Sequence, residues 1–339
     1  QLISVMTYIN WAIIISLFSL IVFAFVYANS LTKPIVKLTE VFARAEKGDL
    51  SVVANTKVQN ELGVAAQGFN RMLNEIKILT FVDPVTQVPN YRSYLLDAHR
   101  LTREHPIKNY YVVVISIDDF KKINSMGGYG FGNETLKQFA ELLNSSLYAY
   151  ELVARYFGDE MVLFLHAESE EIIRLRIQRL LALAQWPFKI MDIEIHLSLS
   201  CGFASHNKLH EIETTIHNAT LAKLKAKKLG GNIAVFFEDG IQQEIKKEQD
   251  IESELFKAIE KKELYPVYQP IVDLRTMQVS GFETLLRWNH PLYYQESIQT
   301  IITIAENNSQ IIEIGRYILN ESLLALKRLH QKYPDLVLV

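Results

Sequence analysis

The sequence predicts a multidomain protein with a transmembrane helix, a coiled-coil pair of helices and α/β domains built around β-sheets. Three observations carry this prediction. No charged residue occurs from Gln1 to Thr32, two helices with apolar seams follow, and apolar strands then alternate with amphipathic helices. A chain of 339 residues, 49% of them hydrophobic, has room for roughly two to three domains. The net charge of −3 gives no argument for nucleic acid as a partner, and the single cysteine, Cys201, excludes an internal disulfide.

Residues 1–30 are expected to cross a membrane. The run from Trp11 to Ala28 is almost purely apolar, and with its flanks it is long enough for the roughly 30 Å hydrocarbon core. Lys33 and Lys37 follow at once, which places the rest of the chain in the cytoplasm. A signal peptide is the alternative, but the run is long, its basic flank lies on the wrong side, and no small-residue cleavage site follows.

Two amphipathic helices are expected within residues 31–79. Their apolar residues are spaced three and four apart, as at the a and d positions of a coiled coil. They are Ile35, Leu38, Phe42 and Ala45 in the first helix and Leu62, Ala65, Phe69, Met72, Ile76 and Leu79 in the second. Ordinary packing on a soluble core is the alternative. A narrow seam on a short helix directly below a membrane instead favours a partner helix.

This segment resembles a HAMP domain. The residues that carry the resemblance are Pro34 in "LTKPIVKL", the "NELG" element at 60–63 and "FNRM" at 69–72. The resemblance implies a parallel four-helix bundle in a homodimer, which passes a signal from outside to the cytoplasm.

Residues 80–240 are expected to form an α/β domain around one sheet. The pattern predicts strands at 110–117, at 151–165 as a hairpin, and at 193–205, with helices at 133–147, 170–184 and 216–232. Two acidic pairs follow strand ends: Asp118-Asp119, and Asp159-Glu160 in the turn of "RYFGDEM". They are candidates to hold Mg²⁺ against a nucleotide phosphate, and Lys121 and Lys227 are candidates to contact phosphate oxygens. The alternative is that these acids only cap helices or face water.

The domain resembles the GGDEF family of diguanylate cyclases. The matching stretches are "DPVTQVPNYR" at 83–92, "ISIDDFKKINSMGGYGFGNETL" at 115–136, "ARYFGDEM" at 154–161 and "AKKLGGN" at 226–232. The resemblance implies a nucleotide site made of Lys121, Asn124, Asp159, Glu160 and Lys227. Asn124 would contact guanine, and Asp159 would be a metal ligand.

The sequence departs from the family pattern at residues that are expected to bind the metal ion and the nucleotide. Ser116 stands at the first metal-binding aspartate, and Asp118 lies on the same face but about 7 Å further along the strand. Phe157 replaces the first glycine of the signature, where a phenyl ring is expected to crowd a nucleotide or close the groove. We therefore expect that this domain makes no cyclic di-GMP. Two expectations stay open: weak GTP binding, or a role only as a dimerising transmitter.

Other substitutions affect contacts around this site. Ser125 and Asn133 replace acids near the guanine and phosphates, and Gly231 replaces an arginine. The upstream Arg-x-x-Asp inhibitory site would run from Tyr148 to Glu151, so its arginine is absent.

Residues 245–339 begin a further unit. A helix at 250–262 and a strand at 265–273 are expected, followed by the strand "MQVSGFETLLRW". By alternation, Glu283, Leu285 and Arg287 share one face of this strand. A surface ion pair is the alternative, but a glutamate and an arginine that flank a leucine in this way favour a site.

This unit resembles the first part of an EAL domain, a TIM-like barrel that hydrolyses cyclic di-GMP. "YQPIVDL" at 268–274, "GFETLLRWNHP" at 281–291 and "IITIAENNSQIIEIGRYIL" at 301–319 carry the resemblance. It implies that Glu283 is a catalytic ligand of Mg²⁺ or Mn²⁺ and that Arg287 holds a phosphate. Gln269 and Leu285 would line the cyclic dinucleotide. The implied reaction is metal-assisted hydrolysis with two ions.

Two features put this unit's own activity in question. The loop "PLYYQESIQTIIT" lacks the glycine and the prolines that usually shape it, and the family's remaining metal ligands would lie after Val339. Gln1 in place of Met and the strand-like "DLVLV" at 335–339 suggest that both ends are cut. We expect the fragment alone to be inactive.

The sequence as a whole predicts a signalling protein of the bacterial inner membrane, with its HAMP, GGDEF and EAL domains in the cytoplasm and an external sensor missing from this chain. The expected function is a cyclic di-GMP phosphodiesterase in full length. The alternative is a receptor for cyclic di-GMP or GTP that has lost catalysis, and a diguanylate cyclase ranks third.

Overall fold

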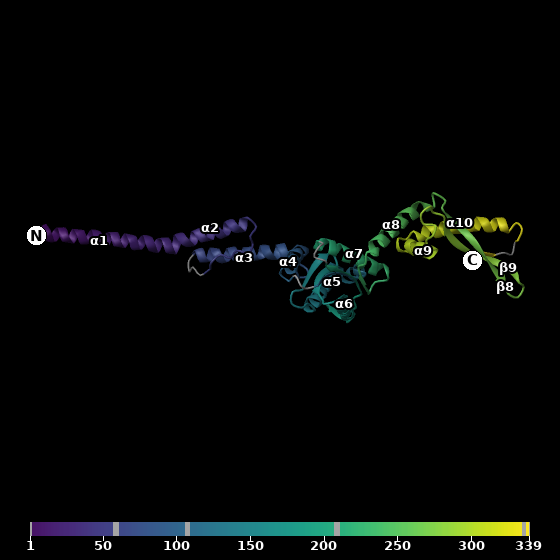
Figure 1. The fold of residues 1–339 in the computed structure, drawn as a ribbon, viewed down its shortest axis with the longest axis horizontal. Helices are drawn as coiled ribbons and strands as arrows, with labels where there is room; N and C mark the ends of the chain where they lie inside the picture. The colour runs from purple at the N-terminus through teal and green to yellow at the C-terminus, as the bar shows by residue number, and fades with distance from the viewer. Residues whose placement is uncertain (1, 57–60, 106–108, 207–210, 334–336, 339) are drawn as a thin grey trace.

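The computed structural model describes residues 2–56, 61–105, 109–206, 211–333 and 337–338, so Asn60 of the "NELG" element lies outside the described residues. Figure 1 shows an elongated molecule. A long helix lies at the N-terminal end, an α/β domain in the middle, and a hairpin with two helices at the other end.

The N-terminal helix is continuous through three segments: α1 (Leu2–Tyr27), the π-helical turn η1 (Ala28–Thr32) and α2 (Lys33–Glu46). Within it, Ile9–Glu46 holds a stretch of mean hydropathy 2.5 with no buried residue. Among the residues that the structure describes, this is the one helix long and apolar enough to cross a membrane.

The helix α3 (Glu61–Phe81) lies beside α2 and runs in the same direction (Figure 1). The rings of Phe42 and Phe69 from the two predicted seams pack against each other at a tilt of 35°, with centroids 4.2 Å apart. The Asn70 side chain accepts a hydrogen bond from the amide N of Ala54 (2.8 Å) and donates one to its carbonyl O (2.9 Å), which ties the connector to α3. Between the helices lies an apolar groove of about 770 Å³.

The central domain has a five-stranded sheet in the order β2-β3-β1-β6-β7, with β6 and β7 parallel and the other neighbours antiparallel. Its elements are α4 (Tyr91–Glu104), β1 (Tyr110–Ile117), α5 (Phe120–Ser145), β2 (Leu152–Phe157), β3 (Glu160–His166), α6 (Glu170–Ala184), β4 (Phe188–Ile190), β5 (Ile193–Ile195), β6 (Leu199–His206), α7 (Ile212–Lys228) and β7 (Ala234–Phe236).

All eight residues of β1 are buried, because helices cover both faces of the sheet. Alternate side chains of β1 enter two separate clusters. Val112 and Val114 pack with residues of α4 and α7, whereas Val113 and Ile115 pack with residues of α5 and α6. The strand end at Ser116 therefore lies on the α7 face of the sheet.

The helix predicted at 216–232 is α7, shifted by four residues toward the N-terminus, and three other predicted elements differ more in extent. The strand predicted at 193–205 is split into β5 and β6, because β5 pairs with β4 in a separate hairpin. The helix predicted to begin at residue 133 begins at Phe120, with a break at Gly127 and Gly128 where the backbone leaves helical geometry.

The third difference is at α8 (Gly240–Ala258), which starts ten residues before the helix predicted at 250. The polar composition of its first half suggests a linker, but Ile241 and Ile245 are buried against Ala222 of α7. The second half belongs to the C-terminal core through Ile251 and Leu255. One helix is thus shared by the two domains.

The C-terminal unit is a hairpin with two helices beside it. Its elements are β8 (Leu264–Asp273), β9 (Gln278–Trp288), α9 (Ile298–Asn307), α10 (Ile311–Leu329) and β10 (Val337–Leu338). The strands β8 and β9 are antiparallel, and β10 lies parallel to β9.

Candidate functional site

The first candidate site is the turn between β2 and β3. Phe157 and Glu160 pair across the strands, so Gly158 and Asp159 form the two-residue loop. Gly158 has φ of +57°, a left-handed conformation that favours glycine at this position of a tight hairpin. Phe157 is 79% exposed. It therefore points to solvent beside the turn and does not itself close a groove over the acids.

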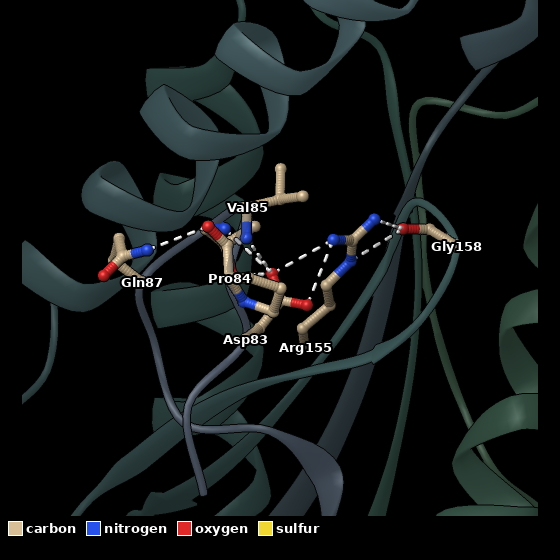
Figure 2. A network of polar contacts seen from close by, with 7 residues as sticks. Asp83, Pro84, Val85, Gln87, Arg155 and Gly158 are labelled. Carbon is tan, nitrogen blue, oxygen red and sulfur yellow. Dashed lines mark hydrogen bonds and ion pairs between the residues drawn. The ribbon is translucent and has the colours of Figure 1, made fainter. Parts of the chain in front are cut away.

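Arg155 fixes the turn to the start of the domain (Figure 2). Its guanidinium donates to both carboxylate oxygens of Asp83, at 3.0 and 3.1 Å, and to the carbonyl O of Gly158, at 3.1 and 2.8 Å. Both side chains of the ion pair are mostly buried, with 18% and 15% exposed. The helix α3 ends at Phe81, two residues before Asp83. The ion pair therefore joins the end of α3 to the turn between β2 and β3.

Asp83 is held in its charged form. Burial alone would raise the pKa of this carboxyl, but hydrogen bonds from Thr86 and Arg155 outweigh it and hold the pKa below its ordinary value. The hydrogen bonds include the Thr86 amide N and Oγ1, both 2.8 Å from Asp83 Oδ1.

Lys223 of α7 forms an ion pair with Glu160 at the first residue of β3. The lysine side chain is 3% exposed and that of Glu160 is 21% exposed. Lys227 lies one turn further along α7 and is exposed. Burial raises the pKa of Asp159 above its ordinary value, although the nearby Lys227 and Lys223 ammonium groups act in the opposite direction.

Ser116 and Asp118 complete this end of the sheet. Ser116 is opposite Glu160 in register, and its Oγ is buried without a hydrogen-bond partner. The Asp118 carboxylate accepts hydrogen bonds from Ser198 Oγ and Ser200 Oγ, both 2.6 Å away, and from the Asn232 amide N at 3.0 Å. Its oxygens are thus committed to holding β1, β6 and the loop after α7 together.

These residues do not fit a Mg²⁺ ion, which needs oxygen ligands in near-octahedral geometry and favours carboxylates. Glu160 is paired with a lysine, Asp118 is engaged by two hydroxyls, and Ser116 is neutral. Among these four positions of the described chain, Asp159 is then the one carboxylate left for a metal ion.

Lys121 and Asn124 lie on α5. In the described part of the chain, neither makes a hydrogen bond or ion pair with Asp159 or Glu160. Asn124 packs against Gly132, where an added Cβ would lie 1.9 Å from Asn124 Oδ1. Their nucleotide-binding roles, like those of Asp159, Glu160 and Lys227, remain predictions from the resemblance.

Glu151 ends the segment 148–151, where the resemblance predicts the position of the inhibitory motif, and it has a structural role. Its side chain is fully buried and accepts hydrogen bonds from the Arg176 guanidinium at 2.6 and 2.9 Å. It also accepts from the amide N of Tyr148 (2.8 Å) and of His166 (2.9 Å). Burial would raise its pKa, but these bonds hold it below the ordinary value.

The second candidate site is one face of the β8–β9 hairpin. Gln269 is directly opposite Glu283, Val267 is opposite Leu285, and Tyr265 is opposite Arg287. Directly opposed residues of an antiparallel pair share a face, so the structure brings the four predicted side chains onto one surface.

Glu283 is exposed, and among the described residues neither it nor Arg287 takes part in an ion pair. Arg287 Nη1 donates to the carbonyl O of Leu286 at 2.7 Å. The open alternative of a surface ion pair between Glu283 and Arg287 is thus not seen. Carboxylate and amide oxygens, as Glu283 and Gln269 offer, are ligands that Mg²⁺ and Mn²⁺ prefer.

Sequence reasoning missed Lys223 and Arg155. A signal for Lys223 was present, because Ala219, Ala222 and Ala226 lie on the same face of the predicted helix. A lysine among alanines on the buried face of a helix needs a partner. Arg155 belongs to the "RYFGDEM" motif, but its partner Asp83 is distant in sequence.

Three family models match successive segments of the chain. Residues 26–77 match the HAMP domain, residues 80–233 match the model described as diguanylate cyclase, GGDEF domain, and residues 252–338 match the EAL domain.

Curated relatives match this chain over only part of their own length. The chain is 27% identical over 277 residues to the bifunctional diguanylate cyclase/cyclic di-GMP phosphodiesterase MucR of Pseudomonas aeruginosa, covering 80% of this chain and 40% of MucR. It is 29% identical over 252 residues to the cyclic di-GMP phosphodiesterase PdeR of Escherichia coli, covering 74% of this chain and 38% of PdeR. The matched part is thus less than half the length of either relative.

One solved structure that is similar is the coiled coil and GGDEF domain of DgcB from Caulobacter crescentus in complex with c-di-GMP. The TM-score is 0.47 at 17% identity, over 51% of this chain and 94% of that chain.

Proposed function

Because the chain carries HAMP, GGDEF and EAL domains of cyclic di-GMP signalling, we propose that it belongs to a cyclic di-GMP phosphodiesterase controlled by a degenerate GGDEF domain. The hydrolytic site is the Glu283 face of the β8–β9 hairpin. The related MucR and PdeR, which are described with phosphodiesterase activity, support this assignment.

One observation carries the proposal: Glu283 is an exposed carboxylate with no ion-pair partner among the residues that the structure describes, and Gln269 lies directly across from it. An acid that only stabilises the fold is expected to have a partner, as Asp83 and Glu151 have. Glu283 instead presents its oxygens to solvent, where a ligand can reach them.

The side chains of this face would have different roles in binding the metal ion, the phosphate and the dinucleotide. Glu283 would hold Mg²⁺ or Mn²⁺, and a metal bound there supplies activation of water and polarisation of the phosphodiester. Arg287 is always charged, and its planar guanidinium is suited to hold a phosphate through paired hydrogen bonds. Gln269 and Leu285 would contact the dinucleotide on either side of these charges. Further metal ligands of a two-ion site are proposed to come from the rest of the full-length protein.

The N-terminal segment would place this activity at a membrane. The apolar helix α1 would anchor the protein in the bacterial inner membrane, with the three domains in the cytoplasm. The groove between α2 and α3, lined by apolar side chains such as Phe42 and Met72, favours a second copy as its cover. A HAMP homodimer would then carry a signal through α3 and the Asp83–Arg155 pair into the central domain.

A binding role without catalysis is the second candidate for the central domain. The observation that favours it is the exposed Lys227 beside the β2–β3 turn. Its ammonium group would offer positive charge to the phosphates of GTP or cyclic di-GMP. Diguanylate cyclase activity ranks last, because Ser116 provides no carboxylate and Glu160 is paired with Lys223.

The test is hydrolysis of cyclic di-GMP by the full-length protein and by Glu283→Ala. We expect the variant to lose roughly 10²-fold or more in turnover, the order seen when a group that stabilises the transition state is removed. Glu306→Ala is a matched control, since Glu306 is also an exposed acid of this unit. Equal turnover by the parent and Glu283→Ala would contradict the assignment.

A further inference from the structure

Lys223 occupies a site that the fold has shaped for it. It is a buried lysine on the face of α7 that packs on the sheet, and α7 approaches β6 very closely at Gly202. A Cβ at Gly202 would lie 2.1 Å from the Ala219 carbonyl O and from the Lys223 amide N. Glycine at this position therefore lets the backbone of Lys223 lie against the sheet, and the side chain reaches Glu160 at the start of β3.

The charge of Lys223 is matched by Glu160. Burying an ammonium group is costly unless an anion and hydrogen bonds compensate. Glu160 supplies this anion. It lies in the β2–β3 turn, at a position where the resemblance predicts an acid of the nucleotide site. The neighbouring Asp159 and the exposed Lys227 add one charge of each sign, so the four side chains are neutral without any metal ion.

The other groups around this pair also lack what a metal ion requires. Ser116, opposite Glu160, offers one neutral hydroxyl, and that hydroxyl is buried without a partner. Asp118 is held by Ser198, Ser200 and the Asn232 amide N. A divalent cation placed here would meet the Lys223 ammonium instead of a second free carboxylate, and like charges repel strongly in a mostly buried setting.

We propose that the Lys223 ammonium is the resident cation of the β2–β3 turn, in the place where a divalent metal would otherwise neutralise the acids. The central domain holds no divalent metal at this turn for that reason. Phosphate groups that reach the turn meet the exposed Lys227, because Lys223 is buried and paired with Glu160. This inference goes beyond the proposed function, because it concerns the cation of the GGDEF domain and is independent of hydrolysis at Glu283.

The experiment counts Mn²⁺ ions bound to the full chain, by the loss of the electron paramagnetic resonance signal of free Mn²⁺. The parent is compared with Lys223→Met, which keeps an unbranched apolar stem and removes the charge. We expect Lys223→Met to bind one Mn²⁺ more than the parent, and Asp159→Asn in that background to abolish the gain. Lys227→Met, an exposed lysine one turn away, is the matched control and is expected to gain none.

A second comparison leaves Lys223 unchanged, so it does not depend on how Lys223→Met folds. The double variant Asp159→Asn, Glu160→Gln is expected to bind as many Mn²⁺ ions as the parent. The inference is overturned if this double variant binds one ion fewer, or if folded Lys223→Met gains none. Any ion at Glu283 is counted equally in every variant, so failure of the phosphodiesterase proposal would show in turnover and not in these differences.

Discussion

The two hairpins of this protein both carry acids, but they differ in what neutralises those acids. In the β2–β3 hairpin, Glu160 is paired with Lys223, and Arg155 of β2 is paired with Asp83. In the β8–β9 hairpin, Glu283 is exposed, without an ion-pair partner in the described part of the chain. Glu160 already has a cationic partner within the fold, whereas Glu283 has none among the described residues. Glu283 is therefore the better candidate for a metal ligand.

The largest expected effect is on stability, at the start of the β2–β3 hairpin. Arg176→Ala removes both guanidinium hydrogen bonds to the fully buried Glu151 and leaves its charge without a partner. We expect the central domain to lose about 3–5 kcal/mol of unfolding free energy. Urea unfolding of the full chain measures the loss.

The control for this variant is Arg174→Ala, on the same helix. Arg174 pairs with Glu170 at i,i+4 spacing, and both side chains are more than 40% exposed. The Arg174 guanidinium also lies 5.5 Å from the centre of the Phe203 ring, so we expect a loss of about 1 kcal/mol or less from it. Similar losses in the two variants would show that burial does not distinguish these ion pairs.

A smaller effect is expected at Asp83, and it depends on pH. Because its pKa is lower in the folded protein, the carboxyl adds stability that is complete above the unfolded pKa of about 3.9. That contribution disappears as pH falls through the folded value. Asp83→Asn should therefore cost about 1–3 kcal/mol at neutral pH and less in acid.

Thermal unfolding of the parent and Asp83→Asn between neutral and acidic pH measures this difference. Glu151 also has a lowered pKa, so both proteins should lose stability in acid. The parent should lose more, and the two unfolding temperatures should converge. A constant difference across the pH range would contradict the role given to the Asp83 charge.

The smallest effect on stability is expected in the second hairpin. Glu283→Gln removes the charge of an exposed side chain and breaks no ion pair. Surface substitutions of this kind change stability by about 0.5 kcal/mol or less. A thermal unfolding scan of the full chain should show an unchanged transition for the C-terminal unit. A marked destabilisation would assign Glu283 to the fold instead of the site.

Local patterns predicted much of this architecture. The apolar helix, the two seams and the buried strand β1 were evident because composition and spacing determine them. The alternation of β9 placed Glu283, Leu285 and Arg287 on one face, and the register with β8 confirms that placement. The roles of these side chains in binding and catalysis stay predictions.

What sequence reasoning missed depends on contacts between distant segments. The partners Asp83 and Arg155 are 72 residues apart, and Glu160 and Lys223 are 63 apart, so only the folded sheet brings them together. Lys223 also lies in the basic run "KLKAKK", which is typical of a solvated helix face. The first half of α8 was also missed. It contains mostly polar residues, and its two buried isoleucines, Ile241 and Ile245, are too few to show a helical pattern.

The most direct measurement supplies the full-length protein with cyclic di-GMP or with GTP, in Mg²⁺ or Mn²⁺, and identifies the nucleotide products. The account predicts that cyclic di-GMP is opened to a linear dinucleotide, that Glu283→Gln abolishes this reaction, and that no cyclic di-GMP forms from GTP. Synthesis of cyclic di-GMP from GTP, or hydrolysis that survives in Glu283→Gln, would contradict the claim that the second hairpin carries the chemistry.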